Sequence, residues 1–238
     1  MEEFKKMVHR LYNGKEGSAL ARSFMDFVPA EEPQGAATSE DMDALIIAHA
    51  KCQYALSQGH LKDAYKLRER CINLLLPSGR IGLISTATPF LLLLLKRFLL
   101  HLRDIALQAD KEEEGRESQD GDSGLATACQ GFLQRLWGTI LQDDARNFVC
   151  MAIYTVGWQC AYKMNKTTVV YRWILPPYEY SLQDQVTASY WKGVVQFNKH
   201  NWMQAVPDLE FAFDHIPPRL FGHRRCVLWR LVTARPSL

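Results

Sequence analysis

The sequence predicts an all-α fold built from repeated helical hairpins, and three observations lead to this prediction. Apolar side chains recur every three or four residues along most of the 238-residue chain, as they do on the buried face of a helix. Glycine, proline and asparagine interrupt this pattern at intervals that suit short turns between helices. Only residues 167–174 are rich in the β-branched and aromatic side chains that favour a strand. Because helices flank this run and no second run could pair with it, we expect a buried helix there.

Residues 1–38 are predicted to hold two short helices and a loop. The apolar face of the first helix is formed by Phe4, Met7, Val8 and Leu11. Gly14 is expected to end this helix in the left-handed conformation that glycine tolerates. A second helix is expected around residues 20–27, before a loop at 29–38 that is rich in proline, glycine and small residues.

Residues 39–109 are expected to form a first helical-repeat segment. Ser39 can cap a helix that Gly59 ends, and the helix after it should end near Pro77. Pro89 suits the first turn of a helix, where its missing amide hydrogen costs no hydrogen bond. The helix that follows is apolar nearly all round, so we expect it at the centre of the fold.

Residues 110–124 carry seven acidic and two basic side chains and no large apolar one, which predicts a solvated, disordered loop. Residues 125–238 form a second predicted helical-repeat segment. Within it, Ser181 and Asp184 make an imperfect capping box, and Asn201 is placed to cap the next helix.

A tetratricopeptide-like pattern lies within this second segment. The pattern needs a small residue in one helix, then alanine, a bulky residue, alanine and proline at set distances. The chain meets it at Gly193, Ala205, Leu209, Ala212 and Pro217. Small residues let antiparallel helices approach closely, so we expect Gly193 and Ala205 to face each other. Pro207 should kink the last helix of the pattern.

An earlier hairpin shares the same register in a degenerate form. The segments Gly59–Ala64 and His200–Ala205 each follow one helix and open the next. Apart from the turn glycine, only Ala64 of the earlier hairpin matches the pattern. The fold prediction is therefore a superhelix of tetratricopeptide-like helical hairpins.

No catalytic or metal-binding motif is recognised in the sequence. His49 and Cys52 lie three residues apart on one helix face, but they lack further ligands at a suitable spacing and are interpreted as core residues. Asp143 and Asp144 lie where a helix begins, and capping explains them better than acid–base chemistry. We therefore predict a protein that is not an enzyme, with no catalytic residues, no metal and no cofactor.

Composition restricts the class of partner and the compartment. A net charge of +2 does not mark the whole chain as a nucleic-acid binder. The six cysteines form no C-x-x-C pair and are interpreted as reduced, buried thiols of a cytosolic or nuclear protein. The N-terminus does not resemble a signal peptide, and the uncharged stretch 81–95 is too short and too polar for a membrane span.

The strongest charge asymmetry lies after Pro217. This part has no acidic residue and contains five arginines: Arg219, Arg224, Arg225, Arg230 and Arg235. Apolar residues alternate with them in the pattern of a basic amphipathic helix. Three interpretations stay open: a structural helix with a solvated arginine face, contact with nucleic-acid phosphates, or contact with an acidic protein.

Three stretches, 44–76, 96–110 and 186–218, together resemble the PCI-domain proteins of the mRNA-export branch and their signalosome-associated relatives. The resemblance extends over roughly residues 1–231. It is most specific at Tyr190, Gly193, Phe197, Ala205, Leu209, Phe211, Ala212, Phe213 and His215. Members of this family are non-catalytic scaffolds in which tetratricopeptide-like hairpins lead into a winged-helix module.

The resemblance implies a scaffold subunit of the nuclear transcription-coupled mRNA-export complex. The implied partners are a large scaffold subunit, a small acidic subunit and, weakly, RNA or DNA, with no membrane. The implied location is the nucleus, with the cytoplasm left open. A signalosome-associated subunit and a tetratricopeptide-type peptide-binding adaptor are the alternatives. The family's winged helix has no counterpart in this chain, so none of its contacts is transferred, and we expect a truncated or partial member.

Overall fold

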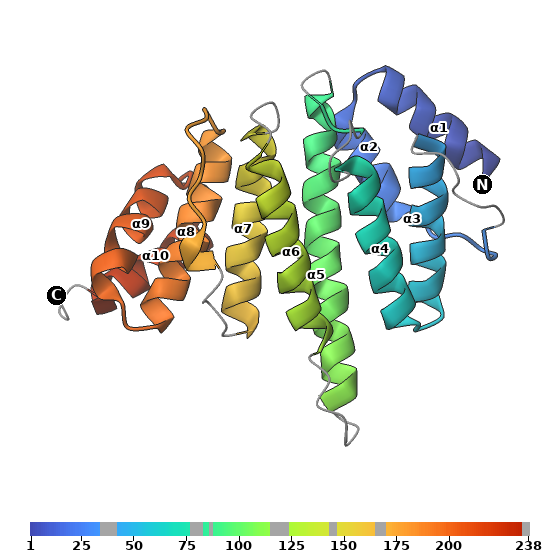
Figure 1. The fold of residues 1–238 in the computed structure, drawn as a ribbon. Helices are drawn as coiled ribbons and strands as arrows, with labels where there is room; N and C mark the ends of the chain where they lie inside the picture. The colour runs from blue at the N-terminus through green and yellow to red at the C-terminus, as the bar shows by residue number, and fades with distance from the viewer. Residues whose placement is uncertain are drawn as a thin grey trace. The chain divides into compact units, whose positions relative to one another are not determined.

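The described residues form ten α-helices and two 3₁₀-helices and contain no strand, which confirms the predicted all-α class of helical hairpins (Figure 1). The computed structural model describes residues 1–33, 42–76, 83–85, 88–114, 124–142, 147–164 and 170–234. Contacts divide the chain into two compact units, Met1–Arg146 (unit 1) and Asn147–Leu238 (unit 2). None of the helices described has the length and apolar character needed to cross a membrane.

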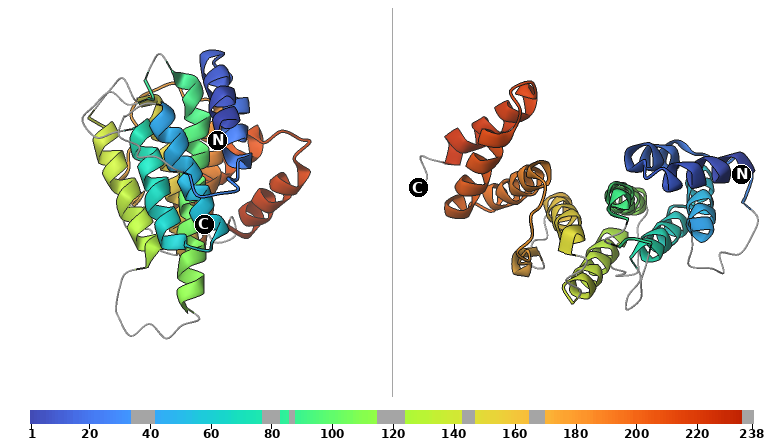
Figure 2. Two further views of the ribbon diagram at one scale, coloured as in Figure 1. Left: turned by 90° about the vertical axis from the view of Figure 1, so that its right-hand side faces the viewer. Right: turned by 90° about the horizontal axis from the view of Figure 1, so that it is seen from above.

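Unit 1 is organised around one long helix. Its elements are α1 (Glu2–Asn13), α2 (Gly17–Asp26), α3 (Met42–Ser57), α4 (Leu61–Leu75), η1 (Pro89–Leu91), α5 (Leu92–Glu114) and α6 (Leu125–Ile140). Helix α5 packs against α2, α4 and α6, and the view from above in Figure 2 shows it end-on between them. The sequence predicts this helix at the centre of the fold, and it lies at the centre of unit 1. Helix α6, which the sequence grouped with the following segment, packs on α5.

The turn after α1 differs from the prediction. Gly14 keeps a right-handed φ of −76°, and the left-handed residue is Lys15, with φ of 56°. The amide of Glu16 donates to the carbonyl of Leu11 at 3.0 Å, which closes the last turn of α1 around Lys15. The helix thus ends one residue later than glycine preference alone predicts.

Helix α5 extends into the stretch predicted to be an acidic loop, because residues 110–114 are helical. The Asp110 carboxylate accepts hydrogen bonds from the amides of Leu125 at 2.7 Å and Ala126 at 3.0 Å. It therefore caps the start of α6, where a negative charge also suits the helix dipole. The rest of the predicted loop, at 115–123, and the predicted cap Ser39 lie outside the described residues, as do Pro77, Asp143 and Asp144.

Unit 2 consists of two helical hairpins and a short connecting turn. Its elements are α7 (Asn147–Met164), η3 (Val170–Arg172), α8 (Leu182–Asn198), α9 (Trp202–His215) and α10 (Phe221–Ala234). Helix α8 packs on both α7 and α9, and α10 packs on α9 (Figure 1).

The buried helix predicted over 167–174 is wrong in the part that is described. Only Val170–Arg172 is helical, as one 3₁₀ turn, and Ile174 is 81% exposed. Pro176 and Pro177 follow closely, and proline disfavours the helical conformation in the residue before it. Trp173 instead packs so tightly on α7 that a Cβ at Gly157 would collide with its ring.

The two turns that the sequence aligned have the same backbone conformation. Gly59 and His200 both have a positive φ, 75° and 58° respectively. In each turn the next amide donates back to the helix: His60 to the Ala55 carbonyl at 2.8 Å, and Asn201 to the Gln196 carbonyl at 3.0 Å. The predicted register of the α3–α4 and α8–α9 hairpins is therefore confirmed, although a left-handed histidine is costlier than a left-handed glycine.

Small residues permit the close approach of α8 and α9. A Cβ at Gly193 would lie 2.8 Å from Cγ of Leu209 and 3.2 Å from its backbone nitrogen. Ala205 and Ala212 are also fully buried. The closest residue to Gly193 is thus Leu209 rather than the predicted Ala205, because the bulky side chain occupies the space that the glycine leaves.

The other residues predicted to pack in the repeats or to cap their helices are also placed by the structure. Ala64 is fully buried in α4, and its carbonyl accepts a hydrogen bond from the Cys52 thiol at 3.3 Å. Ser181 caps α8 as predicted, by accepting from the Asp184 amide at 3.2 Å. Asn201 does not cap α9 with its side chain, which donates to the Gln196 side chain at 3.1 Å instead.

The contact at Gly193 predicts how substitutions will affect stability. Gly193→Ala should lower the melting temperature by a few degrees, because overpacking of about 1–3 kcal/mol exceeds the gain in helix propensity of about 1 kcal/mol. The matched control is Gly222→Ala in α10, where a new Cβ meets nothing within 4 Å. That variant should be neutral or slightly more stable in the same thermal melt. Equal destabilisation by both substitutions would contradict the close packing of α8 on α9.

Candidate docking surface

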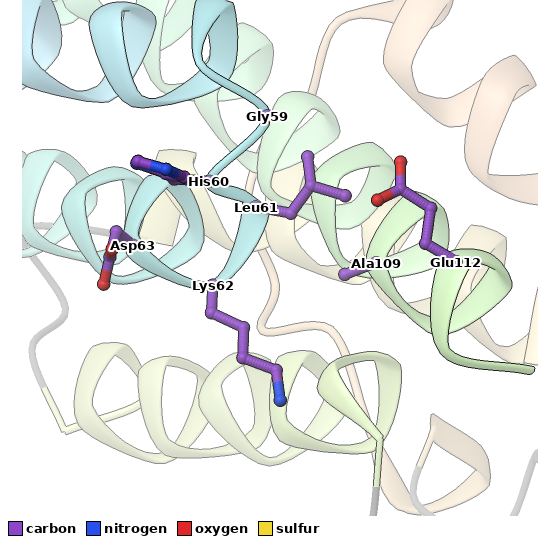
Figure 3. Close-up of a pocket in the computed structure, with 7 residues that line it drawn as sticks. All are labelled: Gly59, His60, Leu61, Lys62, Asp63, Ala109 and Glu112. Carbon is purple, nitrogen blue, oxygen red and sulfur yellow. The ribbon is translucent and has the colours of Figure 1, made fainter. Parts of the chain in front are cut away.

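A shallow pocket lies where the turn between α3 and α4 meets α5. Its volume is about 300 Å³, and it is lined by residues 59–63 together with Ala109 and Glu112. Figure 3 shows Lys62 and Glu112 pointing in different directions, and His60 and Asp63 pointing away from α5. Polar groups do not converge on one point in this pocket, so it lacks the geometry of a catalytic or ligand-binding centre.

A fully buried arginine lies at the centre of unit 1. Arg68 of α4 donates from Nη1 to Nδ1 of His49 at 3.0 Å, and its guanidinium lies 4.4 Å from the centroid of the Phe98 ring. Its Nε and Nη2 have no hydrogen-bond partner among the described residues. Contact with the ring face and with a neutral histidine offsets part of the cost of burying this charge.

Two histidines near Arg68 are held in the neutral state. Burial, followed by the charge of Arg68, lowers the pKa of His49 well below its ordinary value of 6.5. The same two causes lower the pKa of His101 to about 4. Burial also raises the pKa of the nearby Cys71 thiol to about 12. His49, Cys52 and Cys71 are fully buried, so they act as packed core residues, as the sequence predicted for His49 and Cys52, whereas His101 is only partly buried.

In the described part of the chain, no group of three or more His, Cys, Asp or Glu side chains is arranged to hold a metal ion. Five of the six cysteines are buried, and Cys226 on α10 is exposed, so the expectation of buried thiols is wrong at that position.

The arginines of the predicted binding cluster point in different directions. Val227 marks the buried stripe of α10, and at 100° per residue Arg224 and Arg230 lie about 60° to either side of it. Arg225 lies on roughly the opposite side of the helix. Arg219 precedes the helix and is exposed, as Arg225 is. The structure therefore does not gather the four side chains into one patch.

Two of these arginines make contacts within unit 2. The Arg224 guanidinium lies 4.6 Å from the centroid of the Phe213 ring. Arg230 donates from Nη1 to the Cys226 carbonyl at 3.1 Å. Only Arg219 and Arg225 are left exposed for a partner.

Exposed apolar side chains lie on the outward side of α10, to either side of Arg225. The exposed fractions are 72% for Phe221, 46% for Leu228, 62% for Trp229 and 62% for Val232. Leu231, in contrast, is only 5% exposed and packs inward. We call Phe221, Leu228, Trp229 and Val232 the outer face of α10. Large apolar groups clustered at the surface in this way mark interaction sites.

Comparison of the chain with protein-family models, with curated proteins and with solved structures yields no significant match.

The neutral histidines around Arg68 predict a dependence of stability on pH. The unfolded chain takes up protons near the ordinary histidine pKa, whereas the folded chain takes them up only at lower pH. The free energy of unfolding should therefore fall as the pH drops from about 6.5 to 4, by at most about 1.4 kcal/mol per pH unit for each histidine. His101→Asn should flatten the profile of urea midpoints, and His60→Asn at an exposed position should not. If the two variants gave identical profiles, the lowered pKa of His101 would not be a cause of the pH dependence.

Within the described part of the basic segment after Pro217, two arginines are exposed, Arg219 and Arg225, which predicts weak nucleic-acid binding. With about two phosphates neutralised, the log–log salt slope on single-stranded RNA should be near −1.4, about half the value expected for four contacts. The reversals Arg219→Glu and Arg225→Glu should abolish this binding in a filter or anisotropy assay without changing the melting temperature. A slope near −3 would contradict binding through two phosphate contacts. Binding that persists in Arg219→Glu and in Arg225→Glu would contradict the role of these two arginines.

Proposed function

We propose that the protein is a non-catalytic scaffold subunit of a multiprotein complex and docks a partner through the outer face of α10. The proposal is based on this exposed face, because helices of a hairpin array normally bury an apolar face against the next element. Leu228 and Trp229 lie midway along the helix at the two edges of this face, and the centroid of the Trp229 ring lies 6.0 Å from that of Phe197 in α8. An aromatic anchor supported in this way is typical of protein interfaces.

The resemblance to PCI-domain proteins gives the class of complex. The nuclear transcription-coupled mRNA-export complex is the favoured assembly, and the signalosome-associated subunit is the second candidate. All-helical hairpins with tetratricopeptide-like packing around Gly193 support membership of this family. The partners proposed on this basis are a large scaffold subunit and a small acidic subunit.

Contacts in unit 2 weigh against the peptide-binding adaptor. Such an adaptor needs free polar side chains along its hairpin groove, and Lys192, Gln196 and Asn198 are the available ones. Lys192 forms an ion pair with Asp208 at 2.9 Å. Gln196 is buried and donates to the Gln204 side chain at 2.9 Å. Two of the three side chains are thus engaged within the hairpin.

The proposal predicts which substitutions separate the protein from its complex. The tagged chain should co-purify with a defined set of subunits, and mass spectrometry should identify them as export or signalosome components. Leu228→Glu and Trp229→Glu should each reduce their recovery by tenfold or more, because a charge replaces a large apolar side chain of the proposed interface.

The matched control is Ile174→Glu, since Ile174 is 81% exposed and lies outside α10. It should co-purify the same subunits as the unsubstituted chain, and both Ile174→Glu and Leu228→Glu should melt close to the unsubstituted temperature. Normal recovery with both α10 variants would refute docking through this face.

A further inference from the structure

A groove of about 540 Å³ lies within unit 2, where the first turns of α8 meet the segment that joins α9 to α10. Leu182, Val186 and Tyr190 of α8 line one side, and Ile216, Pro217 and Leu220 line the other. Leu182 and Leu220 are 53% and 43% exposed. The groove therefore presents apolar side chains on both walls and has a volume suited to side chains of a bound segment.

The full charge among the residues that line this groove is positive. It belongs to Arg219, which lines the groove together with His215 and His223, and the lining residues include no carboxylate. The start of α10 borders the groove and carries the partial positive charge of a helix N-terminus. Leu220, which precedes α10, has no side-chain oxygen to cap the first amides, and the first turn contains no acidic residue.

The neighbouring helix ends do not cancel this charge. The N-terminus of α8 already has a carboxylate nearby, because Ser181 donates to Asp184 Oδ2 at 2.8 Å. The C-terminus of α9, at His215, carries a partial negative charge. This charge opposes the partial positive charge at the start of α10 but not the full charge of Arg219. Arg219 adds a full positive charge at an exposed position, so the groove favours a segment that brings its own carboxylates.

Three other occupants fit the groove less well. A second copy of the chain would bring the arginines of its own α10 against Arg219, which places like charges together. The chain's acidic stretch at 110–124 has carboxylates but no large apolar side chain to fill the walls. A nucleic-acid strand has phosphates, but it would leave the leucine and valine side chains without apolar contacts.

We propose that this groove binds an amphipathic helical segment of a partner protein, with bulky apolar side chains against α8 and carboxylates beside Arg219 and the start of α10. This inference rests on the proposed scaffold function and adds a second contact, distinct from the outer face of α10, with a stated partner chemistry.

The experiment measures fluorescence anisotropy of the full chain with two labelled helical peptides. The first has leucine at every third or fourth position and glutamate beside the leucines, and the second has lysine in place of each glutamate. The chain should bind the glutamate peptide about tenfold more tightly than the lysine peptide. Arg219→Glu should lower the ratio of the two affinities by about fivefold. Leu182→Glu should weaken the binding of both peptides.

Arg172→Glu is the matched control, because Arg172 is exposed in unit 2 and does not line the groove. It should leave the preference for the glutamate peptide unchanged. Equal affinity for the two peptides, an unchanged preference in Arg219→Glu, or oligouridylate binding that is tighter than binding of the glutamate peptide would overturn the inference. Failure to bind either peptide, together with normal recovery of subunits in the co-purification, would refute the groove and leave the scaffold function standing. Absence of any co-purifying subunit would refute the scaffold function itself, whichever peptide binds.

Discussion

The close approach of neighbouring elements is the constraint on which the rest of unit 2 depends. Gly193 leaves room for Leu209, so that the axes of α8 and α9 come near enough to bury continuous apolar stripes, and Gly157 leaves room for Trp173 beside α7. A hairpin closed in this way buries one face and leaves the other for its neighbour. Helix α10 packs its inner stripe on α9 and touches α8 at Trp229, and most of its outer face stays exposed. The proposed docking surface is thus a direct result of how hairpins pack.

Local features of the chain were predictable because their causes lie within a few residues. The left-handed turn at Gly59, its counterpart at His200 and the Ser181 cap all depend on neighbours along one hairpin. Features with distant causes were not predictable. Asp110 sits in a highly acidic stretch, and only its contact with the start of α6 shows that it caps a helix. Arg68 reads as a surface charge on an amphipathic helix, and its burial depends on Phe98, which lies 30 positions further along the chain.

The candidate site was predicted in part. The sequence placed a basic amphipathic helix after Pro217, and α10 forms there. Treating its arginines as one cluster overlooked the period of the helix, which turns Arg224 and Arg230 to opposite flanks of the buried stripe. Counting 100° per residue also places Leu231 on the inward side of α10 and Val232 on the outward side. The groove beside α8 was not predictable, because residues from two helices and a connecting segment form it.

Hydrogen–deuterium exchange of the full chain, alone and in its co-purified complex, tests the central claim most directly. Amides of α10 and of the first turns of α8 should exchange faster in the free chain and gain protection in the complex, because the partner excludes water and suppresses local opening there. Amides of α5, which is packed within unit 1, should change little. Protection gained elsewhere on the chain, with α10 unchanged, would contradict the account.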